Sequence, residues 1–259
     1  MKKKVDIIIS CFNEEDNIFP FFDEAKKYLK DEKYIFNLVF VNDGSSDKTY
    51  EKITDLKKKV AADGIKNIQV SILSFIHNFG HEAAMCAGID KSDADYLIIM
   101  DVDLQNPPAK IPEILERFDE GADCVLLRRV KYNDASMIKK FFSNSYYLFS
   151  NIVLRNKNAR NVSDFFAIDK NLAKRVRENY RTTLRFVRSF VQFEAKKILF
   201  VDYENAARNS GVSRYNFIKL TKLAITSELS RSKRLRDKHK ETKDNPIYII
   251  DESKTIYKL

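Results

Sequence analysis

Short apolar runs alternate with helix-like segments through the first half of this 259-residue chain. The apolar runs are rich in β-branched or aromatic residues and have the length of strands: Val5–Ser10, Leu38–Val41, Ile68–Leu73 and Tyr96–Met100. The intervening segments have the composition and spacing of helices: Asp16–Lys30, Asp47–Ala62 and Glu82–Lys91. This alternation predicts an α/β fold in which helices cover both faces of a mostly parallel sheet.

The same alternation continues after the fourth apolar run. Pro107-Pro108 ends the loop that follows it, and Ile111–Glu120 is predicted to be a helix that closes at Gly121. Cys124–Leu127 is predicted to be a fifth strand. Upstream, Asp47 is placed to cap the helix that follows it.

The second half of the chain has a different pattern. Residues 141–154 form a helix-spaced apolar series, either a core-facing helix or a hydrophobic surface for a lipid or another subunit. Asn216–Leu229 has the pattern of an amphipathic helix and leads into a basic tail, residues 231–240, with six Lys or Arg and one Asp. Finally, Pro246–Leu259 has the pattern of strand, turn and strand around Asp251–Lys254, which predicts a terminal hairpin.

Composition and charge narrow the class of protein. The hydrophobic content of 44% is ordinary for a chain that buries a sizeable core. No run approaches the roughly 20 apolar residues that cross a bilayer, and no signal peptide is visible, so we expect a cytoplasmic protein that is soluble or peripheral on the membrane. Cys11, Cys86 and Cys124 share no metal-ligand spacing and are expected to be reduced core residues. The net charge of +9 predicts an anionic partner: a phosphorylated substrate, an anionic lipid surface or a nucleic acid.

Two Asp-x-Asp triplets flank the fourth apolar run, and they receive opposite interpretations. Asp101 and Asp103 follow the carboxyl end of that predicted strand, where open α/β sheets bind their ligands. Two carboxylates there could hold a divalent cation against the phosphates of a ligand. Asp93 and Asp95 precede the strand and are interpreted as a solvated turn.

Polar loops also follow the first three predicted strands. These loops are Cys11–Glu15, Asn42–Asp47 and His77–Glu82. Asp43 could accept hydrogen bonds from a base or a ribose, and Gly44 permits a tight turn. The helix after the third loop could offer its N-terminal amides to an anion. Together with Asp101, these loops predict a nucleotide-binding edge of the sheet.

Four segments, taken in order, match one family. They are Cys-Phe-Asn-Glu-Glu at 11–15, Val-Asn-Asp-Gly-Ser-Ser-Asp at 41–47, Asn-Phe-Gly-His-Glu-Ala-Ala at 78–84 and Met-Asp-Val-Asp-Leu-Gln-Asn-Pro-Pro at 100–108. The set resembles the family 2 glycosyltransferases of GT-A fold, and most of all the polyprenyl-phosphate branch with its dolichol-phosphate mannose synthases and undecaprenyl-phosphate glucosyltransferases. Downstream, Ser163-Asp164-Phe165 is similar to that branch's Gly-Asp-Phe, and residues 208–215 are similar to its Arg-x-x-Gly-x-Ser-Lys-Tyr.

The resemblance covers roughly residues 5–230 and implies a domain organisation. Residues 1–215 would form the GT-A domain, and residues 216–259 would form an extension made of the amphipathic helix, the basic tail and the hairpin. Three departures concern the active site: His77 replaces the family's usual Arg, Asn106 its frequent Asp, and Ser163 its usual Gly.

The resemblance also implies a role for each matched residue on the donor side. Asp43 would contact the nucleotide base, and Asn13 and Glu15 would line the same pocket. Asp101, also a nucleotide contact, and Asp103, a candidate catalytic residue, would bring the diphosphate together with a Mg²⁺ or Mn²⁺ ion. Gln105 would complete the metal ligands, since oxygen donors suit both ions.

The acceptor side depends on the chemistry of the acceptor. A sugar hydroxyl needs a general base, whereas a phosphate monoester is already largely an anion at neutral pH and needs positive charge to hold it. The resemblance implies that Asp164 lies by the acceptor as a catalytic base or an orienting group. Candidate acceptor and phosphate-binding residues are Arg129, Arg185, Arg188, Arg208, Ser213 and Arg214. The last three belong to the Arg-x-x-Gly-x-Ser-Lys-Tyr match, where Arg214 replaces Lys.

We therefore predict an inverting, metal-dependent glycosyltransferase of cell-envelope polysaccharide synthesis. It would move a sugar from a nucleotide diphosphate, with UDP favoured over GDP, to polyprenyl phosphate at the cytoplasmic membrane face. The basic tail could add adhesion to an anionic leaflet. Transfer to a saccharide or lipid-linked glycan stays open as the alternative, because this sequence becomes highly charged where many relatives continue into membrane-spanning helices. An oligomer is also left open.

Two other classes of protein fit less well. A nucleotidyltransferase would be expected to carry a glycine-rich, arginine-containing loop after the first strand, and Cys11–Glu15 has no glycine. A nucleic-acid-binding protein is suggested only by the charge. The acidic pocket would repel phosphate unless a cation were bound, and the basic tail lacks interleaved aromatic residues, so we expect no nucleic-acid partner.

Overall fold

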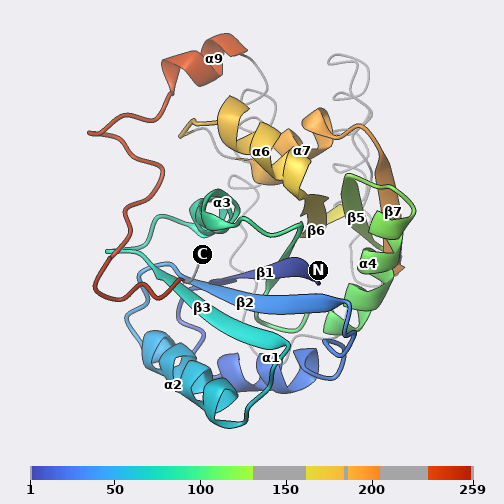
Figure 1. The fold of residues 1–259 in the computed structure, drawn as a ribbon. Helices are drawn as coiled ribbons and strands as arrows, with labels where there is room; N and C mark the ends of the chain where they lie inside the picture. The colour runs from blue at the N-terminus through green and yellow to red at the C-terminus, as the bar shows by residue number, and fades with distance from the viewer. Residues whose placement is uncertain (1, 131–161, 184–185, 205–232, 258–259) are drawn as a thin grey trace, which may run out of the picture.

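A computed structural model describes residues 2–130, 162–183, 186–204 and 233–257 of the chain (Figure 1). In this part, seven strands form one sheet in the order β3-β2-β1-β4-β6-β5-β7. The strands are β1 Lys3–Cys11, β2 Tyr34–Asn42, β3 Ile68–Ser74, β4 Tyr96–Asp101, β5 Cys124–Arg129, β6 Val162–Asp169 and β7 Ile198–Tyr203. Strands β1 to β4 are parallel to one another, so the five predicted strands and the mostly parallel sheet are confirmed.

Strands β6 and β7 lie outside the predicted set. β6 is antiparallel to both of its neighbours, β4 and β5, and β7 is parallel to β5. Because β6 runs in the opposite direction, it begins at the edge of the sheet where β4 and β5 end. This reversal brings the Ser163-Asp164-Phe165 segment to the carboxyl ends of the parallel strands.

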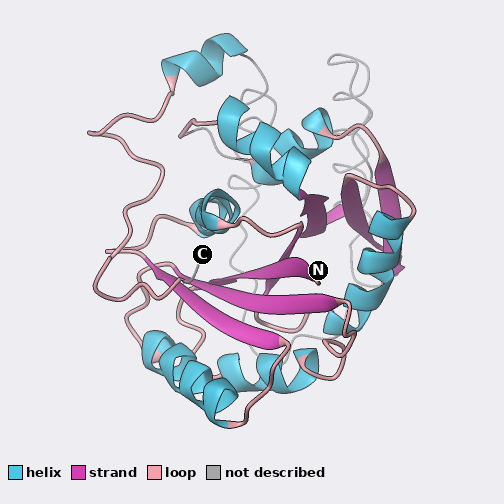
Figure 2. Ribbon diagram, viewed as in Figure 1, coloured by secondary structure: helices cyan, strands magenta, loops and turns pink. Residues whose placement is uncertain are grey.

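Helices cover both faces of the sheet, as predicted (Figure 2). On one face, α1, α2 and α4 share a single apolar cluster with the strands, and on the other face α3, α6 and α7 share a second. The helices are α1 Ile18–Ala25, α2 Thr49–Ala62, α3 His81–Lys91, α4 Ile111–Asp119 (after a 3₁₀ turn, Pro108–Lys110), α6 Lys170–Asn179, α7 Val187–Glu194 and α9 Lys233–Lys238. None of the described helices is both long enough and apolar enough to cross a membrane.

The helix boundaries differ from the predictions for local reasons. α1 is shorter than the predicted Asp16–Lys30, because from Lys27 on the amides bond three residues back instead of four: Tyr28 N donates to Ala25 O at 3.0 Å. α2 begins at Thr49, two residues after Asp47. Asp47 Oδ1 accepts from Thr49 N at 3.0 Å, so the predicted capping residue acts from one position before the N-cap residue, Lys48. α4 closes at Gly121, as predicted, with φ +85°.

Helix α3 packs unusually close to β1. A Cβ atom at Gly88 would lie 2.3 Å from Ile8 Cγ2, so only glycine permits this separation. The close packing places the first turn of α3 over the end of β1, where the Nδ1 atom of His81 lies 2.7 Å from the Ser10 hydroxyl. The close contact between α3 and β1 in the core thus positions the imidazole of His81 at the edge of the sheet.

The last described residues pair with β3. Ile250 and Ile256 form antiparallel bridges with Phe75 and Ile72, and Asp251 N donates to Ser74 O at 2.7 Å. The turn at Asp251–Lys254 is present, but the predicted terminal hairpin is wrong. The edge of β3 offers unpaired backbone groups, and the C-terminal segment, red in Figure 1, satisfies them instead of pairing with itself.

Two further sequence expectations concern single residues. Cys11 and Cys124 are buried free thiols and Cys86 is a half-buried one, as predicted. Asp93 is exposed and forms an ion pair with Lys4. The interpretation of Asp95 as solvated is wrong, because its half-buried carboxylate accepts from Lys4 N at 2.8 Å and ties β1 to the start of β4.

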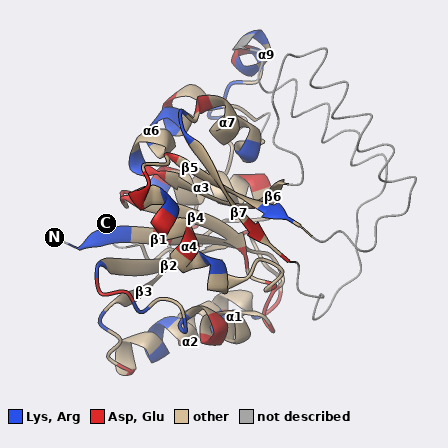
Figure 3. Ribbon diagram, turned by 90° about the vertical axis from the view of Figure 1, so that its right-hand side faces the viewer, with Lys and Arg blue, Asp and Glu red and all other residues tan. Residues whose placement is uncertain are grey.

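Several predictions lie outside the described residues. These concern residues 141–154, Asn216–Leu229, and the acceptor-side residues Arg185, Arg208, Ser213 and Arg214. Of the basic tail, the structure describes α9 and the residues after it. Lys and Arg colour parts of α6 and α9 and the start of β1 in Figure 3.

Candidate active site

The register of the parallel strands aligns the loops that follow them. Asn42 at the end of β2 lies between Cys11 of β1 and Ser74 of β3, and Ser10 lies beside Asp101 of β4. The four loops after these strands therefore emerge side by side from one edge of the sheet. The sequence analysis predicts nucleotide binding at this edge, where open α/β sheets bind their ligands.

Asp101 and Asp103 occupy this edge. Asp101 is the last residue of β4, and its Oδ2 accepts from Asn106 Nδ2 at 3.1 Å while its Oδ1 lies 3.7 Å from His81 Nδ1. Leu104 has a φ of +61°, so the chain turns sharply, and Asp103 Oδ1 accepts from Gln105 N at 3.1 Å. Burial raises the pKa of Asp101, as do the charges of Asp103 and Asp164, against the opposing effect of His81. A cation at this position would relieve that repulsion.

The donor set fits a hard divalent cation that is shared with a ligand. Asp101 and Asp103 supply carboxylate oxygens, the ligands that Mg²⁺ and Mn²⁺ prefer. Among the described residues, no three His, Cys, Asp or Glu side chains are placed to hold a metal ion by themselves. The Nε2 atom of Gln105 is buried without a hydrogen-bond partner, so a donor there is available to a ligand oxygen. Because two carboxylates do not fill the coordination of such an ion, oxygen atoms from a ligand such as a diphosphate would complete the site.

His81 and Glu82, at the start of α3, complete the charged cluster. Burial lowers the pKa of His81, but the charges of Asp101, Asp164 and Glu82 outweigh it and raise that pKa above its ordinary value. Burial also raises the pKa of Glu82, whose Oε2 accepts from Val187 N at 2.8 Å. The sequence analysis assigned neither side chain a role, although both stand in the His77–Glu82 loop that it singled out.

Asp164 faces this cluster from β6. The β4–β6 pairing runs from Tyr96 with Asp169 to Ile99 with Phe166, and the same register continued by two residues sets Asp164 opposite Asp101. Asp164 Oδ1 forms an ion pair with Arg188 Nη1 at 3.0 Å. The predicted acceptor-side carboxylate therefore lies on the strand next to the predicted metal ligand.

Both of the predicted arginines that the structure describes belong to this region. Arg188, on α7, also donates from Nη1 to Val162 O at 2.9 Å, which fixes it against the start of β6. Arg129 is the last residue of β5, and its Nε donates to the Tyr203 hydroxyl at 2.9 Å. Their role toward an acceptor stays a prediction.

Asp43 is buried, with 3% of its surface exposed, and it organises the third loop. Its carboxylate accepts from Phe79 N at 2.6 Å, Gly80 N at 2.8 Å and Asn78 Nδ2 at 3.0 Å. Next to it, Gly44 has a φ of +64°, and a Cβ there would lie 2.3 Å from the His77 carbonyl carbon. The observed contacts of Asp43 thus shape the pocket wall, and its contact with a base stays a prediction.

Asn13 and Glu15 join the first loop to the second. Asn13 has a φ of +57°, and its Oδ1 accepts from Ser46 N at 2.9 Å. Glu15 Oε2 accepts from Lys48 N at 3.2 Å. Phe12, between them and β1, is 43% exposed, which the sequence analysis did not single out. An exposed aromatic ring beside the Asp43 loop is suited to stack on a base.

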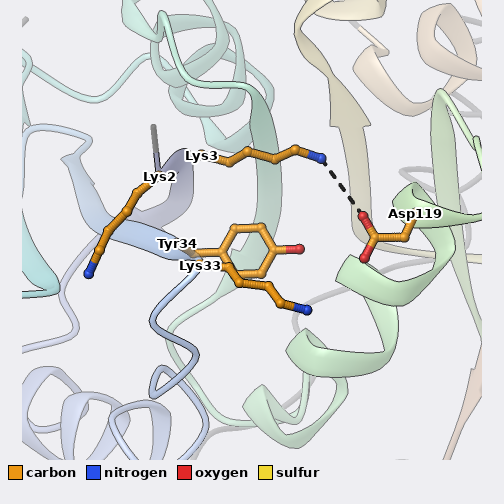
Figure 4. Close-up of a pocket in the computed structure, with 5 residues that line it drawn as sticks. All are labelled: Lys2, Lys3, Lys33, Tyr34 and Asp119. Carbon is orange, nitrogen blue, oxygen red and sulfur yellow. Dashed lines mark ion pairs between the residues drawn. The ribbon is translucent and has the colours of Figure 1, made fainter.

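A separate hollow lies at the opposite end of the sheet (Figure 4). Its lining residues are Lys2, Lys3, Lys33, Tyr34 and Asp119. The three lysines and Tyr34 stand at the amino ends of β1 and β2, Asp119 ends α4, and Lys3 Nζ is 3.8 Å from Asp119 Oδ1. Because this hollow is remote from the carboxyl ends of the strands, it does not belong to the candidate active site.

The fold is GT-A-like, with a mostly parallel sheet between helices and paired aspartates after β4. The model of the glycosyl transferase family 2 matches residues 6–177. The chain belongs to this family, so the predicted family and enzyme class are confirmed.

Named relatives refine the picture. A bactoprenol glucosyl transferase of Shigella phage SfV is 31% identical over 222 residues, which are 86% of this chain and 70% of the relative. Among solved structures, glucosyl-3-phosphoglycerate synthase of Mycobacterium tuberculosis, with Mn²⁺, UDP-glucose and phosphoglyceric acid, has a TM-score of 0.57 at 13% identity, over 90% of this chain and 80% of that one. S. aureus TarS 1–349 with UDP has a TM-score of 0.56 at 17% identity, over 90% and 66%. At these identities the structures show a shared fold.

Proposed function

We propose that this protein transfers a hexose, with inversion, from a UDP-sugar to polyprenyl phosphate, and that the reaction depends on Mg²⁺ or Mn²⁺. The observation that carries the proposal is the placement of Asp101 and Asp103 at the end of β4, opposite Asp164 and Arg188. The likeness to a relative named as a bactoprenol glucosyl transferase supports the lipid acceptor, and the nucleotides bound by the structural neighbours support UDP.

The donor side would bind the nucleotide through loops that the protein has already ordered. Asp43 fixes the third loop, and Asn13 and Glu15 fix the first loop against the second. Asp101 and Asp103 would hold the cation, which supplies the positive charge that stabilises the departing nucleoside diphosphate. Preordered loops lower the entropic cost of binding, so more of the binding energy can orient the diphosphate.

The acceptor side is arranged for an anion. Arg188 is held by Asp164 and by Val162 O, and Arg129 stands at the end of β5. A phosphate oxygen that these cations position would attack the anomeric carbon on the face opposite to the diphosphate. The new carbon–oxygen bond forms as the bond to the diphosphate breaks, and this geometry inverts the anomeric centre. In this arrangement Asp164 orients Arg188 and does not need to remove a proton.

The acceptor implies a place in the cell. A polyprenyl phosphate lies in the membrane, so the protein would work on the cytoplasmic face as a peripheral protein of cell-envelope polysaccharide synthesis. The basic residues of α9 and its neighbours would add attraction to anionic lipids, of about 1 kcal/mol for each residue near the surface.

The proposal is tested by supplying purified protein with UDP-glucose, Mn²⁺ and either undecaprenyl phosphate in detergent or soluble glycans. We expect a lipid-linked hexose, detected by mass spectrometry, and no glycan product. Transfer to the glycan alone would refute the lipid acceptor and favour the saccharide alternative. A parallel series with GDP-mannose and dTDP-glucose tests the preference for UDP.

Asp164→Asn distinguishes an orienting role from a basic one. The amide keeps the size of the side chain but removes the charge that holds Arg188, so we expect about a 10-fold loss of transfer to undecaprenyl phosphate, mostly through KM. A general base would cost about 10² to 10⁴-fold, mostly in kcat. Steady-state rates at varied acceptor concentration separate the two. Asp202→Asn, which breaks the exposed pair with Arg128 (Nε to Oδ1, 2.7 Å), is the matched control and should retain full activity.

A further inference from the structure

A chain of hydrogen bonds connects the end of β5 to the metal-binding aspartate. Arg129 Nε donates to the Tyr203 hydroxyl at 2.9 Å, and this hydroxyl donates to Asn106 Oδ1 at 3.4 Å. Asn106 Nδ2 then donates to Asp101 Oδ2 at 3.1 Å. The two middle members are almost fully buried, since Tyr203 is 2% exposed and Asn106 is 1% exposed. Such a chain is shielded from competition by water.

The direction of this chain is set by Arg129. A guanidinium group has donors and no acceptor, so the Tyr203 oxygen must accept from Arg129, and its own proton is free for Asn106. An amide whose oxygen accepts a hydrogen bond presents its NH₂ group on the other side. Asn106 therefore donates to Asp101. An ionised aspartate at position 106, the residue frequent in the family, has no proton to donate.

The last hydrogen bond of the series, from Asn106, restricts the orientation of the Asp101 carboxylate. With Oδ2 bound to Asn106, the carboxylate cannot rotate freely, and Oδ1 is left on the side of His81. Hydrogen bonds from outer groups commonly fix the orientation of metal-binding carboxylates, and their loss weakens metal binding.

We propose that Asn106 and Tyr203, oriented by Arg129, are positioning residues that hold Asp101 in the orientation that binds the divalent cation. This inference rests on the proposed function. It also joins the two sides of the site, because the chain begins at an arginine that is a candidate ligand of the acceptor phosphate. Because Arg129 Nε donates to Tyr203, a contact of Arg129 with the acceptor phosphate would fall to its Nη atoms.

The test measures Mn²⁺ affinity rather than activity. Tyr203→Phe removes one hydroxyl and keeps the ring, and Asn106→Ala removes the donor itself. With UDP present at saturation, calorimetry should show Mn²⁺ binding about 10-fold weaker in Tyr203→Phe and about 10- to 100-fold weaker in Asn106→Ala. Tyr180→Phe is the control: Tyr180 is also buried, at 5% exposure, and its hydroxyl donates to Glu194 Oε1 at 3.0 Å between α6 and α7.

The outcomes are distinguishable. Weaker Mn²⁺ binding in Tyr203→Phe and Asn106→Ala, with wild-type affinity in Tyr180→Phe, supports the positioning role. A purely structural role would lower the unfolding temperatures of Tyr203→Phe and Tyr180→Phe alike and leave Mn²⁺ affinity unchanged, and this result overturns the inference. If the wild-type protein with UDP binds no Mn²⁺ at all, the cation-dependent function itself fails.

Discussion

Asp103→Ala is expected to lower metal-dependent transfer by at least about 100-fold, because several kcal/mol of charge stabilisation at the leaving diphosphate would be lost with the cation. The side chain is half-buried, and its one described hydrogen bond is from Gln105 N. The variant should therefore fold normally. Initial rates over a range of Mn²⁺ concentrations, with an unfolding curve from circular dichroism, measure both effects.

The second Asp-x-Asp triplet supplies matched controls. Asp93 forms an exposed ion pair with Lys4 at the opposite end of β4, so Asp93→Ala should keep both activity and stability. Asp95→Ala should also keep activity, but losing the bond to Lys4 N should lower the free energy of unfolding by about 1 kcal/mol. Equal losses of transfer in Asp103→Ala and either control would mean that the cation site lies elsewhere.

Asp43→Asn is expected to lower the free energy of unfolding by about 3 kcal/mol and to weaken UDP binding by at least about 10-fold. Three donors converge on the buried Asp43 carboxylate, and an amide offers one acceptor oxygen and turns an NH₂ group toward donors. The Asn78–Gly80 segment would then lose its anchor, and with it one wall of the nucleotide pocket. Urea unfolding gives the stability change and calorimetry with UDP gives the affinity.

Asp169→Ala is the control for stability loss alone. Asp169 caps α6 at the other end of the sheet, where its Oδ1 accepts from Leu172 N at 2.7 Å, and its loss should cost about 1 kcal/mol. UDP affinity should stay unchanged in this variant. Full UDP affinity in Asp43→Asn would contradict the placement of the nucleotide beside the second and third loops.

The parallel half of the sheet was predictable because its strands are nearly continuous apolar runs, the pattern of strands buried on both faces. β6 was missed because polar Ser163 and Asp164 interrupt its apolar run at the start. Its direction was also hidden, since strand–helix alternation predicts parallel neighbours and β6 is antiparallel to both of its own. The C-terminal hairpin failed because the competing partner, β3, lies about 180 residues away in the sequence.

In the candidate site too, residues set by local sequence were predictable and residues placed by tertiary contacts were not. Asp101 and Asp103 could be separated from Asp93 and Asp95 by strand polarity alone, and the pairing of Ser10 with Asp101 places Asp101 at the carboxyl end of β4. The positions of His81 and Glu82 depend on Gly88 letting α3 approach Ile8, which is a tertiary contact. The link from Arg129 through Tyr203 to Asn106 joins three elements that no local pattern relates.

The antiparallel placement of β6 beside β4 has a consequence for how this enzyme could diversify. Asp101 ends β4 and Asp164 lies near the start of β6, so the candidate metal ligand and the candidate acceptor-side carboxylate belong to neighbouring strands of one sheet. Under the proposed function, the sugar would pass between groups held by these two strands, whose spacing is set by backbone geometry. Loop sequences can change to suit another acceptor while that distance stays the same.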